Sequence, residues 1–477
     1  MNLKTKVVTG LGWIAGANFL GQMITWAITI VVMRILSPAD YGLLAMSSVF
    51  VAFLTMMASA GLGPAIVQAS EISDVKLRKL FGLIIALNLS LFFLLFSTAP
   101  LIANFFDESR LVNIVRVLSL QFVILSFAVI PESLLGRELN FKMRAMVDLF
   151  SNVTGGLLTL MLALAGYGVW SLVAGTMLSV VVRTIGVNVF APYIRWPDWS
   201  LRGTGALIAF GGNVTASRIL WFFYSQADMF IAGKLLGKEA LGFYSVAMHL
   251  ASLPVQKISG ILNQVAFPAF SQIKDDPNLV ATHVLKAVRI LSFFSFPVLW
   301  GVSSVAPELV RLLLGANWEP AILPLQVLPA IMPLRMISNF LPSAVDSVGR
   351  PDISMKNLVV ASIVLPVAFF VGSHWGVQGL CFAWLIGFPL VFISNLVRVL
   401  PALSLRLNQL IGAMAPPAFA SAVMYGSIVG IRHAIATETG IAWRLGILVF
   451  VGIVIYGIGA IITNRRVCFE VLGVIKR

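Results

Sequence analysis

The sequence has 477 residues, of which 59% are hydrophobic and only 11% are charged, and its mean hydropathy is +0.96. Soluble domains do not contain so many apolar side chains and disordered chains contain far fewer, so both classes are excluded. The net charge of +14 comes from short basic clusters between apolar runs, which argues against a nucleic-acid-binding protein. Two cysteines cannot form a disulfide framework or a multi-cysteine metal site.

Long apolar runs follow one another along the whole chain. A bilayer core of about 30 Å requires roughly 20 apolar residues in a helix, and about fourteen runs meet this requirement. Their approximate limits are residues 10–33, 41–67, 80–103, 111–131, 145–166, 169–190, 207–232, 241–267, 284–314, 321–348, 354–372, 377–400, 410–431 and 441–463. The first run is far longer than the apolar region of a secretory signal, so it is interpreted as a span. The predicted fold class is an all-α integral membrane protein with about fourteen transmembrane helices.

The positions of Lys and Arg predict the orientation of these spans. An even number of spans places both ends of the chain on the same side of the membrane. With the first residue in the cytoplasm, most Lys and Arg residues outside the spans fall in cytoplasmic segments, as the positive-inside rule requires. The prediction is therefore an N-in, C-in arrangement with a basic cytoplasmic tail.

An internal repeat divides the chain. The segment RILSPADYG at residues 34–42 is echoed by KLLGKEALG at residues 234–242, exactly two hundred positions later in the numbering. A second echo relates GVWSL at residues 168–172 to GVQGL at residues 376–380. The common order of the echoes predicts two halves of about six spans each, followed by two further spans.

The predicted domains follow from this repeat. They are an N-terminal lobe at residues 1–200, a C-terminal lobe at residues 201–405, and two extra transmembrane helices with the basic tail at residues 406–477. Because six is even, both lobes begin on the cytoplasmic side, and they are parallel repeats about an axis along the membrane normal. Alternating-access transporters use such pseudo-symmetric lobes to form a substrate cavity between them.

Three cations lie deep within predicted spans of the second half, where a charge costs at least a few kcal/mol. They are Arg218, Arg335 and Lys257. We expect them to line the cavity. Two alternatives stay open: Lys257 can extend its ammonium group to the cytoplasmic interface, and Arg218 can form a structural ion pair with Asp228.

Helical spacing groups further residues with Arg218. Phe222 and Ser225 share its face of the helix, and Trp221 and Asp228 lie at the margin of that face. We expect this face to line the cavity.

The first span has a polar stripe of its own. It contains Asn18 and Gln22, and it coincides with the Arg218 stripe under the offset of the repeat. The two stripes predict a pair of equivalent cavity-lining helices, although Asn18 and Gln22 are also suited to hydrogen bonding between helices. His249 and Asp228 are the candidates for ion coupling, with a packing role for His249 as the alternative.

This combination of side chains favours an anionic ligand that carries sugars. Guanidinium groups bind phosphate in a bidentate manner, and aromatic rings cover the faces of sugars. The sequence contains no paired carboxylates near an outer boundary, no Ser/His/Asp set, no metal-ligand spacing and no glycine-rich phosphate loop. A transporter without cofactor or metal is therefore predicted. A membrane-embedded glycosyltransferase or polymerase is the alternative from another class, but the short outer loops disfavour it.

Several stretches of the chain resemble one family. They are residues 34–42 and 61–63, residues 234–244, residues 267–276 and residues 350–354. They look like the Wzx-type polysaccharide flippases of the multidrug/oligosaccharidyl-lipid/polysaccharide exporter superfamily, with the colanic-acid branch nearest. The resemblance covers essentially the whole chain.

The resemblance implies a multi-pass protein of the bacterial inner membrane. Such a flippase transfers undecaprenyl-diphosphate-linked oligosaccharide from the cytoplasmic to the periplasmic leaflet, for exopolysaccharide, capsule or O-antigen-type polysaccharide synthesis. The implied driving force is an electrochemical gradient, and the implied partners are membrane lipid, a polysaccharide polymerase and a co-polymerase. A cation-coupled multidrug antiporter of the same fold is the alternative. The chain departs from drug antiporters and some lipid II flippases in its first helix, where Asn18 and Gln22 replace an ionisable residue.

Overall fold

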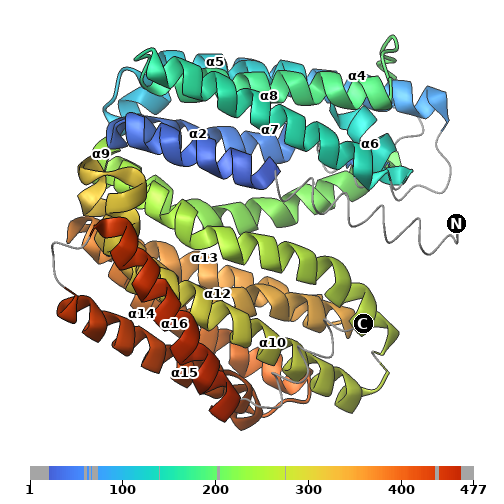
Figure 1. Ribbon diagram of the computed structural model, residues 1–477. Coiled ribbons are helices and arrows are strands. Elements are labelled where there is room, and N and C mark those ends of the chain that lie inside the picture. Colours follow the sequence, from blue (N-terminus) through green and yellow to red (C-terminus); the bar gives the residue numbers. More distant parts are fainter. Residues whose placement is uncertain are drawn as a thin grey trace, which may run out of the picture. The chain divides into compact units, whose positions relative to one another are not determined.

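The computed structural model describes residues 21–58, 62–63, 66, 73–138, 140–200, 205–273, 275–435 and 440–463, which form helices joined by short connections (Figure 1). Side chains are not described for residues 141, 206–218, 220, 256–265 and 267–269. Within the described part, ten helices are long and apolar enough to cross a membrane, and a bent pair brings the number to eleven. The predicted all-helical membrane fold is confirmed, whereas the number of fourteen spans stays a prediction.

The chain divides into two compact units, residues 1–242 and residues 243–477. The helices of the first unit are α2 (Pro38–Ala58), α4 (Asp74–Phe106), α5 (Leu111–Leu125), α6 (Val129–Arg137), α7 (Phe141–Leu164), α8 (Val169–Phe190) and the beginning of α9 (Gly205–Gln272), with a shorter helix at Gly21–Ile35. Extensive contacts join α7 to α8 and α4 to α5. Small residues permit the first of these pairings, because a Cβ at Gly155 or Gly175 would overlap the opposite helix.

Residues 111–131, predicted as one span, lie in the end-to-end pair α5 and α6, which is bent by 49° and extends to Arg137. Pro131 lies in the first turn of α6 and has no N–H to donate to the preceding turn, so the helix is interrupted just before it. Residues 284–314 were also predicted as one span, and this span is likewise divided near a proline. There α10 ends at Ser304, and Pro307 opens the short helix α11 (Ala306–Leu309).

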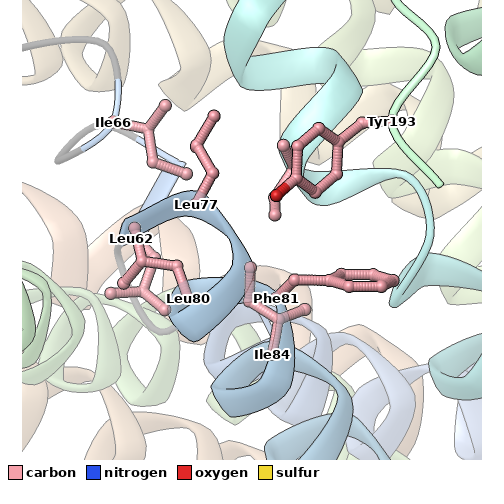
Figure 2. Packing of buried hydrophobic residues seen from close by; sticks show 8 residues of the cluster. Leu62, Ile66, Leu77, Leu80, Phe81, Ile84 and Tyr193 are labelled. Atoms are coloured by element: carbon pink, nitrogen blue, oxygen red, sulfur yellow. The ribbon is translucent and has the colours of Figure 1, made fainter. Parts of the chain in front are cut away.

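An apolar cluster closes one end of the first unit. Figure 2 shows Leu77, Phe81 and Ile84 of α4 beside Tyr193, which belongs to the segment after α8. The rings of Phe81 and Tyr193 meet edge to face at 5.9 Å. Burial raises the pKa of Tyr193 to about 12, above its ordinary value of 10. The cluster therefore holds the segment after α8 against the start of α4.

The second unit continues α9 and contains the remaining helices. They are α10 (Pro277–Ser304), α11, α12 (Ile322–Ser347), α13 (Pro351–Ser373), α14 (Gly376–Ala402), α15 (Leu407–Ala434) and α16 (Ile441–Thr463), with a π-helical turn at Val310–Leu314 and a 3-10 helix at Ala316–Ala321. α12 packs against α10 and α14, α15 packs against α10, and α16 packs against α15. The last two helices are thus attached to the unit chiefly along α10 (Figure 1).

Gly237 interrupts α9 between the two spans predicted at residues 207–232 and 241–267. Its φ of 79° and ψ of 178° are non-helical, and a positive φ is accessible to glycine without steric cost. The chain passes from one compact unit to the other at Gly242, five residues further on. The predicted division at residues 200 and 405 stays a prediction.

The two copies of the repeated motif pack against each other within the first unit. A Cβ at Gly42 would overlap the carbonyl oxygen of Lys238, and a Cβ at Gly242 would overlap the carbonyl oxygen of Pro38. Under the offset of the repeat, Pro38 corresponds to Lys238 and Gly42 to Gly242. The two backbone contacts are therefore made by equivalent residues of the two copies, so the repeated motifs are related by pseudo-symmetry in the structure.

Candidate functional site

Arg335 lies near the middle of α12 in the second unit and is half-buried. Its guanidinium carbon lies 4.6 Å from the centroid of the Trp384 ring on α14, and its Nη1 is 4.0 Å from the sulfur of Met248. Among the described residues no carboxylate forms an ion pair with it. A cation without a counter-ion in the middle of a membrane-spanning helix is costly, so Arg335 is a strong candidate for ligand binding.

Trp384 is fixed in position by its own neighbours. The indole is 1% exposed, and its Nε1–H donates a hydrogen bond of 2.8 Å to the hydroxyl of Tyr244. The ring of Phe369 packs against it at 5.0 Å. Because the indole is both enclosed and hydrogen-bonded, it presents a rigid aromatic surface to the guanidinium of Arg335.

Trp384 and Tyr244 were not predicted as site residues from the sequence. Each is an aromatic residue in an apolar run, which is the ordinary composition of a membrane-spanning helix. The one available signal was that a buried indole or phenol in lipid requires a hydrogen-bond partner. That signal does not identify the partner, because the two residues are separated by 140 positions.

The face predicted around Arg218 on α9 is divided in the structure. Phe222 is buried, with its ring 5.4 Å from that of Phe53 on α2. Trp221 is 53% exposed, so it is available to a ligand or to lipid. Ser225 is half-buried and donates a hydrogen bond of 3.1 Å to the carbonyl of Phe222. Phe222 therefore joins α9 to α2, and Trp221 is the accessible aromatic residue of this group.

Several predicted site residues fall outside the described side chains. Arg218 and Lys257 lie on α9, but only their backbone is described, and Asn18 precedes the first described residue. Gln22 lies half-buried at the start of the helix at Gly21–Ile35. Their contribution to a shared site stays a prediction.

The two candidates for ion coupling lie on α9 in different surroundings. The carboxylate of Asp228 is 2% exposed and accepts a hydrogen bond of 2.8 Å from the backbone N–H of Met229. His249 is exposed at the surface of the second unit. A deeply buried carboxylate suits proton coupling better than an exposed imidazole, and the role of both residues stays a prediction.

A charge-balanced network joins α6, α7 and α8 in the first unit. Glu132 accepts from Arg144 at 2.7 Å and from Arg183 at 2.8 Å, and Arg183 also pairs with Asp148 at 3.0 Å. Two cations and two anions leave no net charge to attract an anionic ligand. The network therefore stabilises the helix packing, and it differs in this respect from Arg335.

A second set of ion pairs lies where α4 ends. Asp107 pairs with Lys234 at 2.8 Å, and Glu108 pairs with Arg110 and with Lys238. The hydrogen bond from Arg110 lowers the pKa of Glu108 to about 2, and the hydrogen bond from Lys238 contributes to the same shift. Lys234 and Lys238 flank the break in α9, so these pairs connect the end of α4 to the crossing of the two repeated motifs.

A family model described as polysaccharide biosynthesis protein matches residues 31–323. The chain belongs to this family. The lipopolysaccharide biosynthesis protein WzxC of Escherichia coli (strain K12) is 26% identical over 429 residues, which are 88% of this chain and 86% of WzxC. The succinoglycan biosynthesis transport protein ExoT of Rhizobium meliloti (strain 1021) is 28% identical over 322 residues, which are 67% of this chain and 64% of ExoT.

Solved structures support the fold of this family member. The lipid II flippase MurJ, in an inward closed conformation, matches with a TM-score of 0.76 at 15% identity, over 96% of this chain and 99% of MurJ. An inward-facing MATE family transporter of the MOP superfamily matches with a TM-score of 0.65 at 17% identity, over 80% of this chain and 94% of the transporter. The predicted family and the transporter fold are confirmed, and the chain is a membrane transport protein rather than an enzyme.

Proposed function

We propose that this protein is a flippase for undecaprenyl-diphosphate-linked oligosaccharide repeat units. It moves them from the cytoplasmic to the periplasmic leaflet of the bacterial inner membrane, for exopolysaccharide, capsule or O-antigen-type polysaccharide synthesis. Family membership, the likeness to WzxC and ExoT, and the fold shared with MurJ support this function. The single observation that carries it is the guanidinium of Arg335, which has an aromatic partner but no counter-ion among the described residues.

A diphosphate matches the chemistry around Arg335. The contact with Trp384 uses the face of an aromatic ring, so the guanidinium N–H groups still require oxygen acceptors. Phosphate oxygens accept from guanidinium in a bidentate manner and supply the missing negative charge. Because no described carboxylate occupies these donors, a diphosphate binds without displacing a resident anion.

The remaining predicted residues extend the proposed site. Arg218 supplies a second cation for the diphosphate, and Lys257 recruits it from the cytoplasmic side. Trp221, Phe222 and Ser225 contribute to the wall of the cavity together with Asn18 and Gln22, and Asp228 or His249 couples an ion gradient to transport.

The proposed architecture has two six-helix lobes at residues 1–200 and 201–405 and two extra helices at residues 406–477. Both ends of the chain lie in the cytoplasm. Alternating access follows from rocking of the lobes. A polysaccharide polymerase and a co-polymerase act on the product in the periplasmic leaflet.

A cation-coupled multidrug antiporter is the second candidate, and the likeness to a MATE transporter favours its fold. The electrostatics of the second unit argue against it. Arg335 repels a cationic drug, and no described carboxylate in its surroundings compensates for that charge.

The test uses cells depleted of the protein and complemented with variants at equal abundance. Lipid-linked oligosaccharide is quantified in each leaflet with a membrane-impermeant reagent that modifies glycans. Depletion is expected to accumulate the intermediate in the cytoplasmic leaflet. Arg335→Ala is expected to lower transfer at least about tenfold, since a hydrogen bond to a charged group contributes roughly 1.5–3 kcal/mol.

Arg311→Ala is the matched control. Arg311 belongs to the same unit and pairs with Glu319 at a surface where both side chains are about half exposed, so its loss should leave transfer unchanged. A normal leaflet distribution in depleted cells would contradict the function. Normal transfer by Arg335→Ala would contradict the site alone, and Arg218→Ala would then be examined in the same assay.

A further inference from the structure

An apolar pocket with a volume of about 440 Å³ lies between α10, α15 and α16 of the second unit. Its lining includes Pro297, Gly301 and Leu309 on one side and Met424 and Tyr456 on the other, and it is almost entirely apolar. Along the unbroken helix α16, the lining runs from Leu445 to Tyr456, which corresponds to about 16 Å at 1.5 Å per residue. The pocket is thus long enough to hold a substantial part of an acyl chain.

A buried cluster of three charged side chains lies beside this pocket. Glu308, Arg432 and Arg444 have side-chain exposures of 6%, 13% and 20%. Oε1 of Glu308 lies 3.1 Å from Nε of Arg432 and 3.3 Å from Nε of Arg444, while its Oε2 has no hydrogen-bond partner among the described residues. Within the described part of the chain, one carboxylate faces two guanidinium groups, so these three side chains together carry a net positive charge.

The cluster is located at one end of the pocket. Glu308 precedes the lining residue Leu309, and Arg444 precedes the lining residue Leu445. Arg432 belongs to the last turn of α15, and Arg444 belongs to the first turn of α16. The charges therefore lie at helix ends, where the apolar part of a membrane gives way to water, and the pocket extends from them toward the middle of the helices.

We propose that this pocket binds an anionic glycerophospholipid of the bilayer. One acyl chain lies along the apolar lining, and the phosphate lies against Arg432 and Arg444, which share the single carboxylate of Glu308 among the residues that the structure describes. A phospholipid with net negative charge neutralises the cluster, whereas a zwitterionic one does not. This site is separate from the one proposed for the transported diphosphate, and its occupant joins α15 and α16 to α10.

The experiment uses the full-length protein, purified in detergent and depleted of lipid. Native mass spectrometry measures binding of phosphatidylglycerol and of phosphatidylcholine with identical acyl chains. The wild type is expected to bind one phosphatidylglycerol about fivefold more tightly than phosphatidylcholine, as one net charge near a surface predicts. Arg444→Gln leaves the pair of Glu308 and Arg432 and should abolish this preference, while Arg311→Gln should preserve it.

A second pair of variants tests the apolar part of the pocket. A Cβ at Gly301 meets only Met424 Cε, at 3.8 Å, so Gly301→Leu fills the pocket without a backbone clash. Gly446→Leu is the control, because a Cβ there meets nothing within 4 Å and Gly446 does not line the pocket. Gly301→Leu should lower the affinity for each of the two phospholipids at least fivefold, and by about the same factor for both. Gly446→Leu should leave both affinities unchanged. Ile453→Trp replaces Gly301→Leu if that variant fails to fold.

Three results would overturn the proposal. They are equal binding of the two phospholipids by the wild type, unchanged binding by both pocket-filling variants, and displacement of phosphatidylglycerol by an equimolar polyprenyl phosphate. The first two results are independent of transport, and the third would place the carrier lipid of the proposed substrate in this pocket, so none of the three contradicts the proposed flippase function.

Discussion

Arginine side chains within the apolar helices of this protein are neutralised to different degrees. Arg183 pairs with two carboxylates, Arg432 and Arg444 share one, and Arg335 contacts an aromatic ring and a thioether. A balanced network needs no further anion, whereas an unbalanced one is stabilised by binding an anion. The degree of neutralisation therefore separates structural arginines from those suited to binding.

Tyr244→Phe tests whether Trp384 positions Arg335. The substitution removes the acceptor of the buried indole N–H, and an unsatisfied buried donor costs about 1–3 kcal/mol. We expect a lower unfolding temperature in detergent together with slower transfer of lipid-linked oligosaccharide. Tyr456→Phe removes a comparable hydrogen bond, from the hydroxyl to the carbonyl of Phe293, away from Arg335. It should lower stability without slowing transfer; equal transfer rates in the two variants would contradict a positioning role.

Glu108 predicts a specific pH dependence of stability. Its pKa is about 2 in the folded protein, compared with an ordinary value of 4.5, so the folded state favours the ionised carboxylate. The resulting stabilisation is complete above pH 4.5 and is lost as the pH falls through about 2. We expect the wild type to have a higher free energy of unfolding than Glu108→Gln at pH 7. When unfolding is measured from pH 7 to pH 3, this difference in free energy should decrease below pH 4.5. If the difference in the free energy of unfolding stays constant from pH 7 to pH 3, ionisation of Glu108 does not contribute to the pH dependence of stability.

At the scale of helices, the two copies of the repeated motif form a close crossing of α2 and α9. Gly42 and Gly242 allow each backbone to approach a carbonyl of the other helix, and a backbone carbonyl cannot rotate away as a side chain can. The ion pairs of Asp107 and Glu108 with Lys234 and Lys238 lie at the same place. Backbone approach and ion pairing together stabilise this crossing.

Gly42→Ala and Gly242→Ala test the pseudo-symmetry of the crossing. Each added methyl group forces α2 and α9 apart, and we expect each to destabilise the protein by about 1–3 kcal/mol. Because both act on one contact, the double variant should cost less than the sum of the single variants. Gly412→Ala, where a Cβ meets nothing within 4 Å, is the control for unfolding in detergent. If the loss of stability in the double variant equals the sum of the two single losses, the two glycines make independent contacts.

For the whole molecule, the distribution of basic residues predicts an N-in, C-in topology. Alkaline phosphatase is active only when it is exported to an oxidising compartment. Fused after Glu319, in the predicted outer segment between α10 and α12, it should be active. Fused after Arg406, in a predicted cytoplasmic segment, it should be inactive. The opposite pattern would invert the predicted orientation.

The positions of the helices could be predicted from the sequence because length and hydropathy are local properties. The interruption at Gly237 was also indicated, as a gap between two apolar runs. The bend between α5 and α6 was not indicated: the predicted span ends at Pro131, whereas the chain bends before this proline and continues as α6 to Arg137. Arg335 was recognised as a candidate because a charge in an apolar run is conspicuous.

Local sequence thus determined that this chain is a helical membrane protein, where its apolar helices lie and that it contains a repeat, and it predicted which charges lie within the spans. Only the tertiary structure decided which groups lie beside the arginines: Trp384 beside Arg335, and one Glu308 between Arg432 and Arg444 at the helix ends. The physical reason is that the solvent around these helices is lipid and not water. Helices in lipid are apolar on every face, so hydrophobic periodicity does not reveal which face meets a neighbour. The rotation and crossing of the helices then select the partners.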